Sequence, residues 1–157
     1  PSLMEKAFGR WFEFNDAKEN YRLLVYKDPL THKNKAYLPQ TVQIFSVDSF
    51  YFRPVEFENE WVFMRILFED KVKLYLHKKY YTTFERSGFY NQFYIIRPDG
   101  KSLMINTDNF FPFKTRAGNF FKDCETVYRK IMNNTYTAKN LLEIIEEYNK
   151  WLNSKSL

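Results

Sequence analysis

The sequence is poor in the residues that most catalytic and metal sites require. Its 157 residues include one cysteine, two histidines and four glycines. A single cysteine excludes an internal disulfide. No CxxC, HxxxH or calcium-loop pattern is present, so we predict no metal site. No apolar run reaches the roughly 18 residues that a membrane-spanning helix needs. We therefore expect a protein that is not an enzyme, with no cofactor and no transmembrane helix.

Charge of either sign is spread along the chain. There are 24 Lys and Arg against 19 Asp and Glu, a formal net charge of +5, and no run of five like charges occurs. Mixed charge of this kind usually serves solubility. The small basic excess leaves an acidic partner or an anionic membrane surface open as partners.

Aromatic residues are abundant. The chain has 17 Phe, 12 Tyr and 3 Trp, a share of 20%. Aromatic side chains favour the half-buried surfaces of β-sheets and bury large areas. The length is typical of one domain with its own core. We expect a single domain over 1–157, mainly β over 1–113 and a helical pair over 114–157.

Turn-forming residues divide the first part of the chain into short strand candidates. The clearest hairpin covers 91–106, with its turn at Pro98-Asp99-Gly100. A second hairpin is expected over 60–81, with its turn at Glu69-Asp70-Lys71, although apolar residues at helical spacing near its start leave a helix open. Other strands are expected over 7–15 and 21–27, and over 41–55 as two short strands around 48–49 or one bent strand.

The hydrophobic period changes near the end of the chain. Apolar residues at helical spacing predict one amphipathic helix over about 116–133 and another over about 138–152, with Thr137 as the N-cap of the second. The predicted fold class is α+β, in which an antiparallel β-sheet of aromatic-rich hairpins is followed by two C-terminal amphipathic helices.

Cys124, the one cysteine of the sequence, is the one candidate for a thiol nucleophile. A reactive thiol needs a neighbouring base, and nothing in the spacing of His32 or His77 links either to it. Cys124 lies on the apolar stripe of the expected 116–133 helix, away from a helix start that would lower its pKa. We interpret it as a buried structural residue.

The best local candidate for a binding surface is the stretch KVKLYLHKKYY, residues 71–81. Its alternation should place Val72, Leu74 and Leu76 on one side of a strand and the polar members on the other. The candidate binding residues are Lys73, Tyr75, His77 and Lys79. Basic and aromatic residues in alternation can bind single-stranded nucleic acid by stacking and phosphate contacts. The simpler interpretation is a sheet face kept soluble by its lysines.

Two stretches of the chain carry a family resemblance. FFKDCETVYRKIMNNTYTAKNLLEIIEEYNKW combines an aromatic pair, Asp-Cys, a helix ending in Lys-Ile, a loop Tyr and a closing Tyr-Asn. Together with the middle region from AYLPQTVQIF to KLYLHKKY, it resembles a broad group of uncharacterised Bacteroidetes proteins. The resemblance covers about residues 35–150. It implies a periplasmic or secreted protein, associated with the outer membrane, without catalysis. The chain starts at Pro1 and shows no signal peptide, so we expect a processed N-terminus, and a signal removed with it stays open.

The expected function is therefore that of a non-enzymatic, exported interaction module. It would be an accessory subunit that docks on another protein or at the outer membrane. One alternative is a small-ligand carrier, or a hydrolase without a known motif, with a pocket between sheet and helices. The other alternative is single-stranded nucleic-acid binding through the basic and aromatic stretch.

Overall fold

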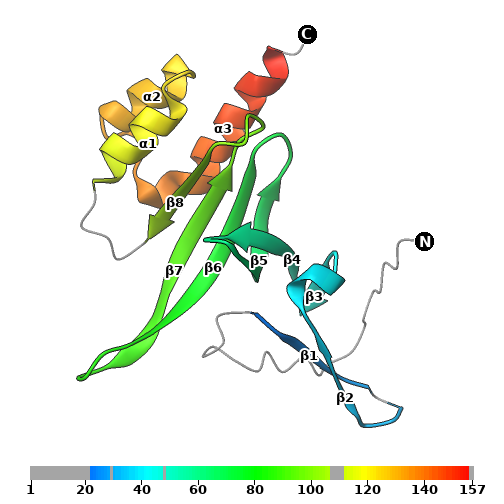
Figure 1. Cartoon of the computed structure of the whole chain (residues 1–157). Coiled ribbons are helices and arrows are strands. Elements are labelled where there is room, and N and C mark those ends of the chain that lie inside the picture. The colour runs from blue at the N-terminus through cyan, green and yellow to red at the C-terminus, as the bar shows by residue number, and fades with distance from the viewer. Residues whose placement is uncertain (1–21, 29, 48, 107–111, 156–157) are drawn as a thin grey trace. The chain divides into compact units, whose positions relative to one another are not determined.

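The computed structural model describes residues 22–28, 30–47, 49–106 and 112–155 (Figure 1). Within them lie eight strands, three α-helices and two short 3-10 turns. The strand expected over 7–15 lies outside the described residues. The elements are β1 Leu24–Lys27, β2 Asn34–Tyr37, η1 Pro39–Thr41, β3 Phe45–Val47, β4 Phe50–Phe57, β5 Glu60–Glu69, β6 Lys73–Thr82, β7 Ser87–Ile96, β8 Ser102–Asn106, α1 Phe113–Phe121, α2 Glu125–Met132, η2 Ala138–Asn140 and α3 Leu141–Ser154.

The strands form antiparallel sheets in chain order. β1 and β2 make a two-stranded sheet, and β3 to β8 make a six-stranded sheet in which each strand neighbours the next in sequence. The predicted α+β class is confirmed. Both expected hairpins are confirmed as well, as β5–β6 and β7–β8, and the 41–55 segment adopts the two-strand alternative as β3 and β4.

The described structure falls into two compact units. The first contains the residues up to Ile66 together with His77–Phe89, and the second contains Leu67–Leu76 and Tyr90–Leu157. Strands β5, β6 and β7 contribute residues to both units. The prediction of one domain over 1–157 stays a prediction.

Aromatic side chains fill the core of the first unit. Phe45 stacks on Phe52 with ring centroids 5.2 Å apart, and it meets the edge of Phe63 at 4.9 Å. Leu24 of β1 joins this cluster. Because aromatic pairs add attraction beyond their buried area, these short strands gain a specific register as well as burial.

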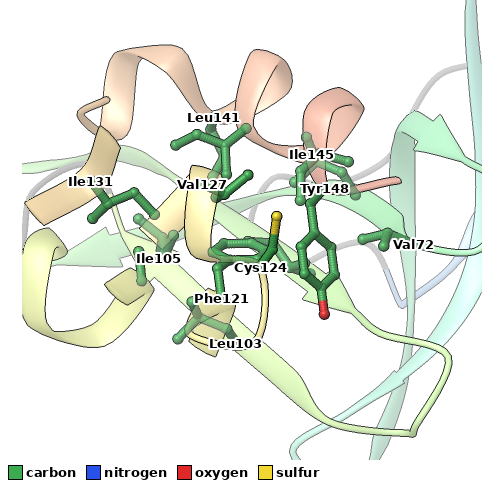
Figure 2. Close-up of a cluster of buried hydrophobic side chains, with 14 residues drawn as sticks. Val72, Leu103, Ile105, Phe121, Cys124, Val127, Ile131, Leu141, Ile145 and Tyr148 are labelled. Atoms are coloured by element: carbon green, nitrogen blue, oxygen red, sulfur yellow. The ribbon is translucent and has the colours of Figure 1, made fainter. Parts of the chain in front are cut away.

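Apolar residues of strands and helices together form the core of the second unit (Figure 2). Val72 of the β5–β6 turn and the β8 residues Leu103 and Ile105 pack with residues of all three helices. The helical contribution is Ala117, Phe121, Val127, Ile131, Leu141, Ile144, Ile145 and Tyr148. All of these except Ala117 belong to the apolar stripes that the sequence predicts, although Met132 and Leu142 of the same stripes are exposed. Hydrophobic burial of the stripes explains the packing of the helices within this unit.

The prediction of a single helix over 116–133 is wrong. The structure has two helices there, α1 and α2, and Cys124 precedes α2 in an extended conformation with φ −103° and ψ 95°. The amide of Cys124 donates to the carbonyl of Phe121 at 3.0 Å, so the carbonyl of Phe120 lacks its helical partner. The count of two C-terminal helices is thereby corrected to three.

Arg97, at the end of β7, explains this break. Its guanidinium donates to the carbonyl of Phe120 at 2.6 Å and forms a bidentate pair with the carboxylate of Asp123 at 3.1 and 2.6 Å. The hydroxyl of Tyr148 donates to the same carboxylate at 2.9 Å. Charge-assisted bidentate bonds are strong and directional. These bonds stabilise Asp123 and satisfy the Phe120 carbonyl, which has no partner within the helix, and so favour a corner over a continuous helix.

Candidate interaction surface

The four predicted binding residues lie on one strand, β6, but they do not form one exposed surface. Tyr75 and His77 are 2% and 3% exposed, so the polar face expected from the alternation is wrong for both. The strand lies between β5 and β7, and its consecutive residues Leu74 and Tyr75 are both buried, so burial does not follow the alternation there. Lys73 and Lys79 are half-buried. A binding role for the four residues stays a prediction.

The buried members have partners within their own units. In the second unit, the hydroxyl of Tyr75 donates to the carboxylate of Glu69 at 2.6 Å. In the first unit, the ring of His77 lies 6.2 Å from the ring of Phe57, and the ammonium group of Lys79 lies 3.9 Å from the carboxylate of Glu58. These contacts stabilise the strand. Stacking of nucleic-acid bases requires exposed ring faces, which Tyr75 and His77 do not offer.

Cys124 is a packed core residue. Its side chain is 1% exposed beside Phe121, Val127 and Tyr148 (Figure 2). Burial raises the pKa of the Cys124 thiol, so the reactive thiolate is disfavoured. Cys124 lies directly before α2, so the mid-helix position expected from the sequence is wrong. Its predicted burial is confirmed.

A cluster of three ionisable groups, Lys130, Tyr136 and Glu147, connects α2 and the loop after it with α3. The carboxylate of Glu147 accepts hydrogen bonds from the ammonium group of Lys130 at 2.9 and 2.7 Å and from the hydroxyl of Tyr136. Burial raises the pKa of Glu147, but these hydrogen bonds outweigh it and leave the pKa below its ordinary value. The hydrogen bond to Glu147 raises the pKa of Tyr136. Because both carboxylate oxygens are already occupied, this cluster connects helices and does not present a general base.

The tip of the β6–β7 hairpin exposes a large apolar side chain, Phe84, on a hydrogen-bonded turn. The amide of Thr83 donates to the carbonyl of Arg86 at 2.7 Å. The hydroxyl of Thr83 donates to the same carbonyl at 3.0 Å and accepts from the amide of Arg86 at 3.2 Å. These three bonds close a turn whose two apical residues are Phe84 and Glu85. The apex is thus a defined backbone structure.

Aromatic side chains gather around this tip. Phe84 is fully exposed, and Phe89 is 48% exposed. The ring of Tyr80 lies 5.2 Å from that of Phe89. A Cβ atom built on Gly88 would lie 3.1 Å from the hydroxyl of Tyr81, so the Tyr81 side chain lies directly against that glycine. The result is an apolar apex followed by a partly covered aromatic surface.

Basic residues accompany these aromatics. Lys78, Lys79 and Arg86 lie in the hairpin, whereas Glu85 is its one acidic residue between His77 and Phe89. Lys78, Glu85 and Arg86 are exposed, and Lys79 is half-buried. We define the hairpin tip as residues 78–89. The predicted stretch 71–81 overlaps the start of the tip and includes Lys79, but the sequence analysis missed Phe84, although an aromatic residue within the polar run TTFERSG was an available signal.

The first unit has other exposed apolar side chains. The guanidinium of Arg65 covers the ring of Phe50 at 3.5 Å from its centroid. Leu30, Leu38, Tyr51 and Trp61 are also exposed. Single exposed apolar residues are ordinary in a folded protein. The hairpin tip is the stronger candidate because the fully exposed Phe84 shares one hairpin with the exposed Phe89 and the exposed basic residues Lys78 and Arg86.

The described residues contain no group of three or more His, Cys, Asp and Glu placed to hold a metal ion. Of the helices in the described ranges, none combines the length and the hydropathy needed to cross a bilayer. No protein-family model, curated protein or solved structure matches this chain.

Proposed function

We propose that this chain is a non-enzymatic, exported interaction module that docks through its hairpin tip, residues 78–89. It is an accessory subunit that works on another protein or at the outer membrane. The observation that carries the proposal is Phe84, which is fully exposed at the apex of a hydrogen-bonded turn. Burial of a Phe side chain is worth about 1.5–3 kcal/mol, so a partner that covers it gains affinity.

Export and association with the outer membrane rest on the resemblance to the Bacteroidetes group. The residues of that resemblance have structural roles here, which suits a family defined by its fold. Phe121, Cys124 and Tyr148 are buried in the core, and Asp123 binds Arg97. The formal charge of +5 suits an acidic partner surface.

The alternative of a small-ligand carrier or a hydrolase with a pocket between sheet and helices receives less support. In the second unit, strands and helices share a cluster of buried apolar side chains, the buried Asn149 is already hydrogen-bonded to Val72 and Asp70, and the charged cluster around Glu147 is internally paired. A ligand site normally combines an apolar cavity with a few convergent polar groups. Nucleic-acid binding through the β6 face receives less support because Tyr75 and His77 are buried.

Site-specific photocrosslinking tests the proposal. A photoreactive phenylalanine analogue is placed at position 84 of the full chain in the producing cells, and at position 142 as the matched control. Leu142 is 46% exposed on α3, outside the tip. We expect an adduct, to a protein or to lipid, from position 84 only. Equal adducts from both positions, or none from position 84 in the folded protein, would contradict docking through the tip.

Fractionation of the same cells tests the export part separately. The chain should be recovered with the periplasmic, outer-membrane or secreted fraction. Recovery with the cytoplasmic fraction alone would contradict export while leaving the docking result intact.

A further inference from the structure

We infer that the hairpin tip is a lipid-contact element, in which Phe84 enters the interfacial layer of an anionic bilayer surface and the basic residues of the tip face the headgroups. This inference rests on the proposed function and specifies the partner of the same site. The partner that we infer is lipid, and docking in a protein pocket is the contrary result that the test can give.

The order of residues along the hairpin matches the layers of a membrane interface. Phe84 is at the apex, Tyr81 and Tyr80 follow on β6, and Lys79 and Lys78 come next. At about 3.3 Å per residue, Lys79 lies roughly 15 Å behind the apex along the strand. Apolar residues reach the acyl boundary, tyrosines prefer the headgroup level, and lysines attract anionic lipid from behind it.

Arg86 extends the basic character to the apex itself. Its side chain is exposed beside Phe84, where a guanidinium can bind lipid phosphate in two-point fashion. Glu85 is the opposing charge, and its exposed position favours shallow insertion over deep insertion. Lys79 is partly offset by Glu58 at 3.9 Å, so Lys78 and Arg86 are the freer contributors of positive charge.

The small size of the tip favours lipid over a protein partner. A stable protein interface usually buries about 1,000 Å² or more in total. One fully exposed aromatic side chain with one half-exposed neighbour is a small fraction of such an area. Peripheral binding to a bilayer needs only shallow apolar insertion together with electrostatic attraction to anionic lipids. The basic residues around Phe84 supply that attraction.

Co-sedimentation of the full chain with vesicles tests this assignment. Vesicles of phosphatidylcholine alone are compared with vesicles that also contain phosphatidylglycerol. The wild type should bind the anionic vesicles and be released by high salt. Phe84→Ser should weaken the binding at least about tenfold. Lys78→Ala combined with Arg86→Ala should reduce binding to the level seen with phosphatidylcholine, and Leu142→Ser should bind as the wild type does.

A second measurement does not depend on whether the Phe84→Ser variant folds. Phe84→Trp should show a blue-shifted emission with anionic vesicles and quenching by brominated lipid, relative to the wild type. A folded wild type that stays in the supernatant at every composition, or a Phe84→Ser variant that binds equally well, would overturn the lipid assignment. If position 84 then still crosslinks to a protein, docking through the tip stands and only the partner class is wrong.

Discussion

The side-chain amide of Asn149 in α3 satisfies the backbone amide of Val72 in the β5–β6 turn. The carbonyl oxygen of Asn149 accepts from the Val72 N–H at 3.3 Å, and its amide nitrogen donates to the carboxylate of Asp70 at 2.7 Å. Both Asn149 and Val72 are buried, so water cannot replace the bond to the Val72 amide. One side chain thus fixes the last long helix to a turn within the second unit.

Asn149→Ala should lower the free energy of unfolding by about 1–3 kcal/mol, because it leaves the buried amide of Val72 without its acceptor. Asn153→Ala is the matched control on the same helix. Asn153 is exposed and reaches the same Asp70 carboxylate only at 3.4 Å, so its effect should be within about 0.5 kcal/mol. Urea unfolding followed by circular dichroism measures both. Equal losses from the two variants would contradict the role assigned to Asn149.

Arg97→Lys should lower the free energy of unfolding by about 1.5–3 kcal/mol. A lysine cannot serve the Phe120 carbonyl and both oxygens of Asp123 together. Lys101→Ala removes a neighbouring exposed ion pair with Asp99 and should change stability by less than about 1 kcal/mol. Chemical denaturation compares the two variants. A lysine variant as stable as the wild type would show that the α1–α2 corner does not depend on the guanidinium.

Cys124→Ala should cost about 1 kcal/mol of stability and leave crosslinking from position 84 unchanged. The thiol of the native protein should react with a labelling reagent far more slowly than the thiol of the urea-unfolded chain, because burial raises its pKa and blocks access. Time courses of labelling in the two states measure this difference. Similar rates would refute the structural assignment.

Acid should destabilise the second unit partly through Glu147. Its folded-state pKa lies below the ordinary value, so its contribution is present above the unfolded pKa of about 4.3 and is lost as the pH falls through the folded pKa. Glu147→Gln should therefore flatten the dependence of unfolding free energy on pH in this acid range. Glu146→Gln, an exposed neighbour on α3, is the control and should retain the wild-type slope. Parallel slopes for the wild type and Glu147→Gln would contradict the assignment.

The sequence predicted the elements whose signals are local. Pro98-Asp99-Gly100 forms the expected turn, and Gly100 has the positive φ of 81° that its residue type permits. Thr137 is the expected N-cap, although it caps the 3-10 turn η2 that leads into α3. In each case a few neighbouring residues determine the backbone conformation.

The parts that the sequence did not predict depend on distant residues. The apolar stripe from Phe120 to Ile131 fits one helix, and the break arises because Arg97 binds the Phe120 carbonyl from another strand. Tyr75 and His77 alternate as an exposed face would, but β6 has neighbours on both edges and they are buried. The exposure of Phe84 depends on the turn between Thr83 and Arg86, which the sequence pattern did not predict. Periodicity reports which residues share a face, and not what covers that face.

The pairing of Arg97 with Asp123 across 26 positions of sequence also offers a criterion for recognising relatives. An apolar stripe can arise in many unrelated chains, whereas a basic residue at a strand end matched to an acidic residue in a helix corner is a correlated pair. Among homologous sequences, the two positions should vary together, with loss of charge at one accompanied by loss at the other. Covariation between them, more than the aromatic content, would trace the lineage of this fold.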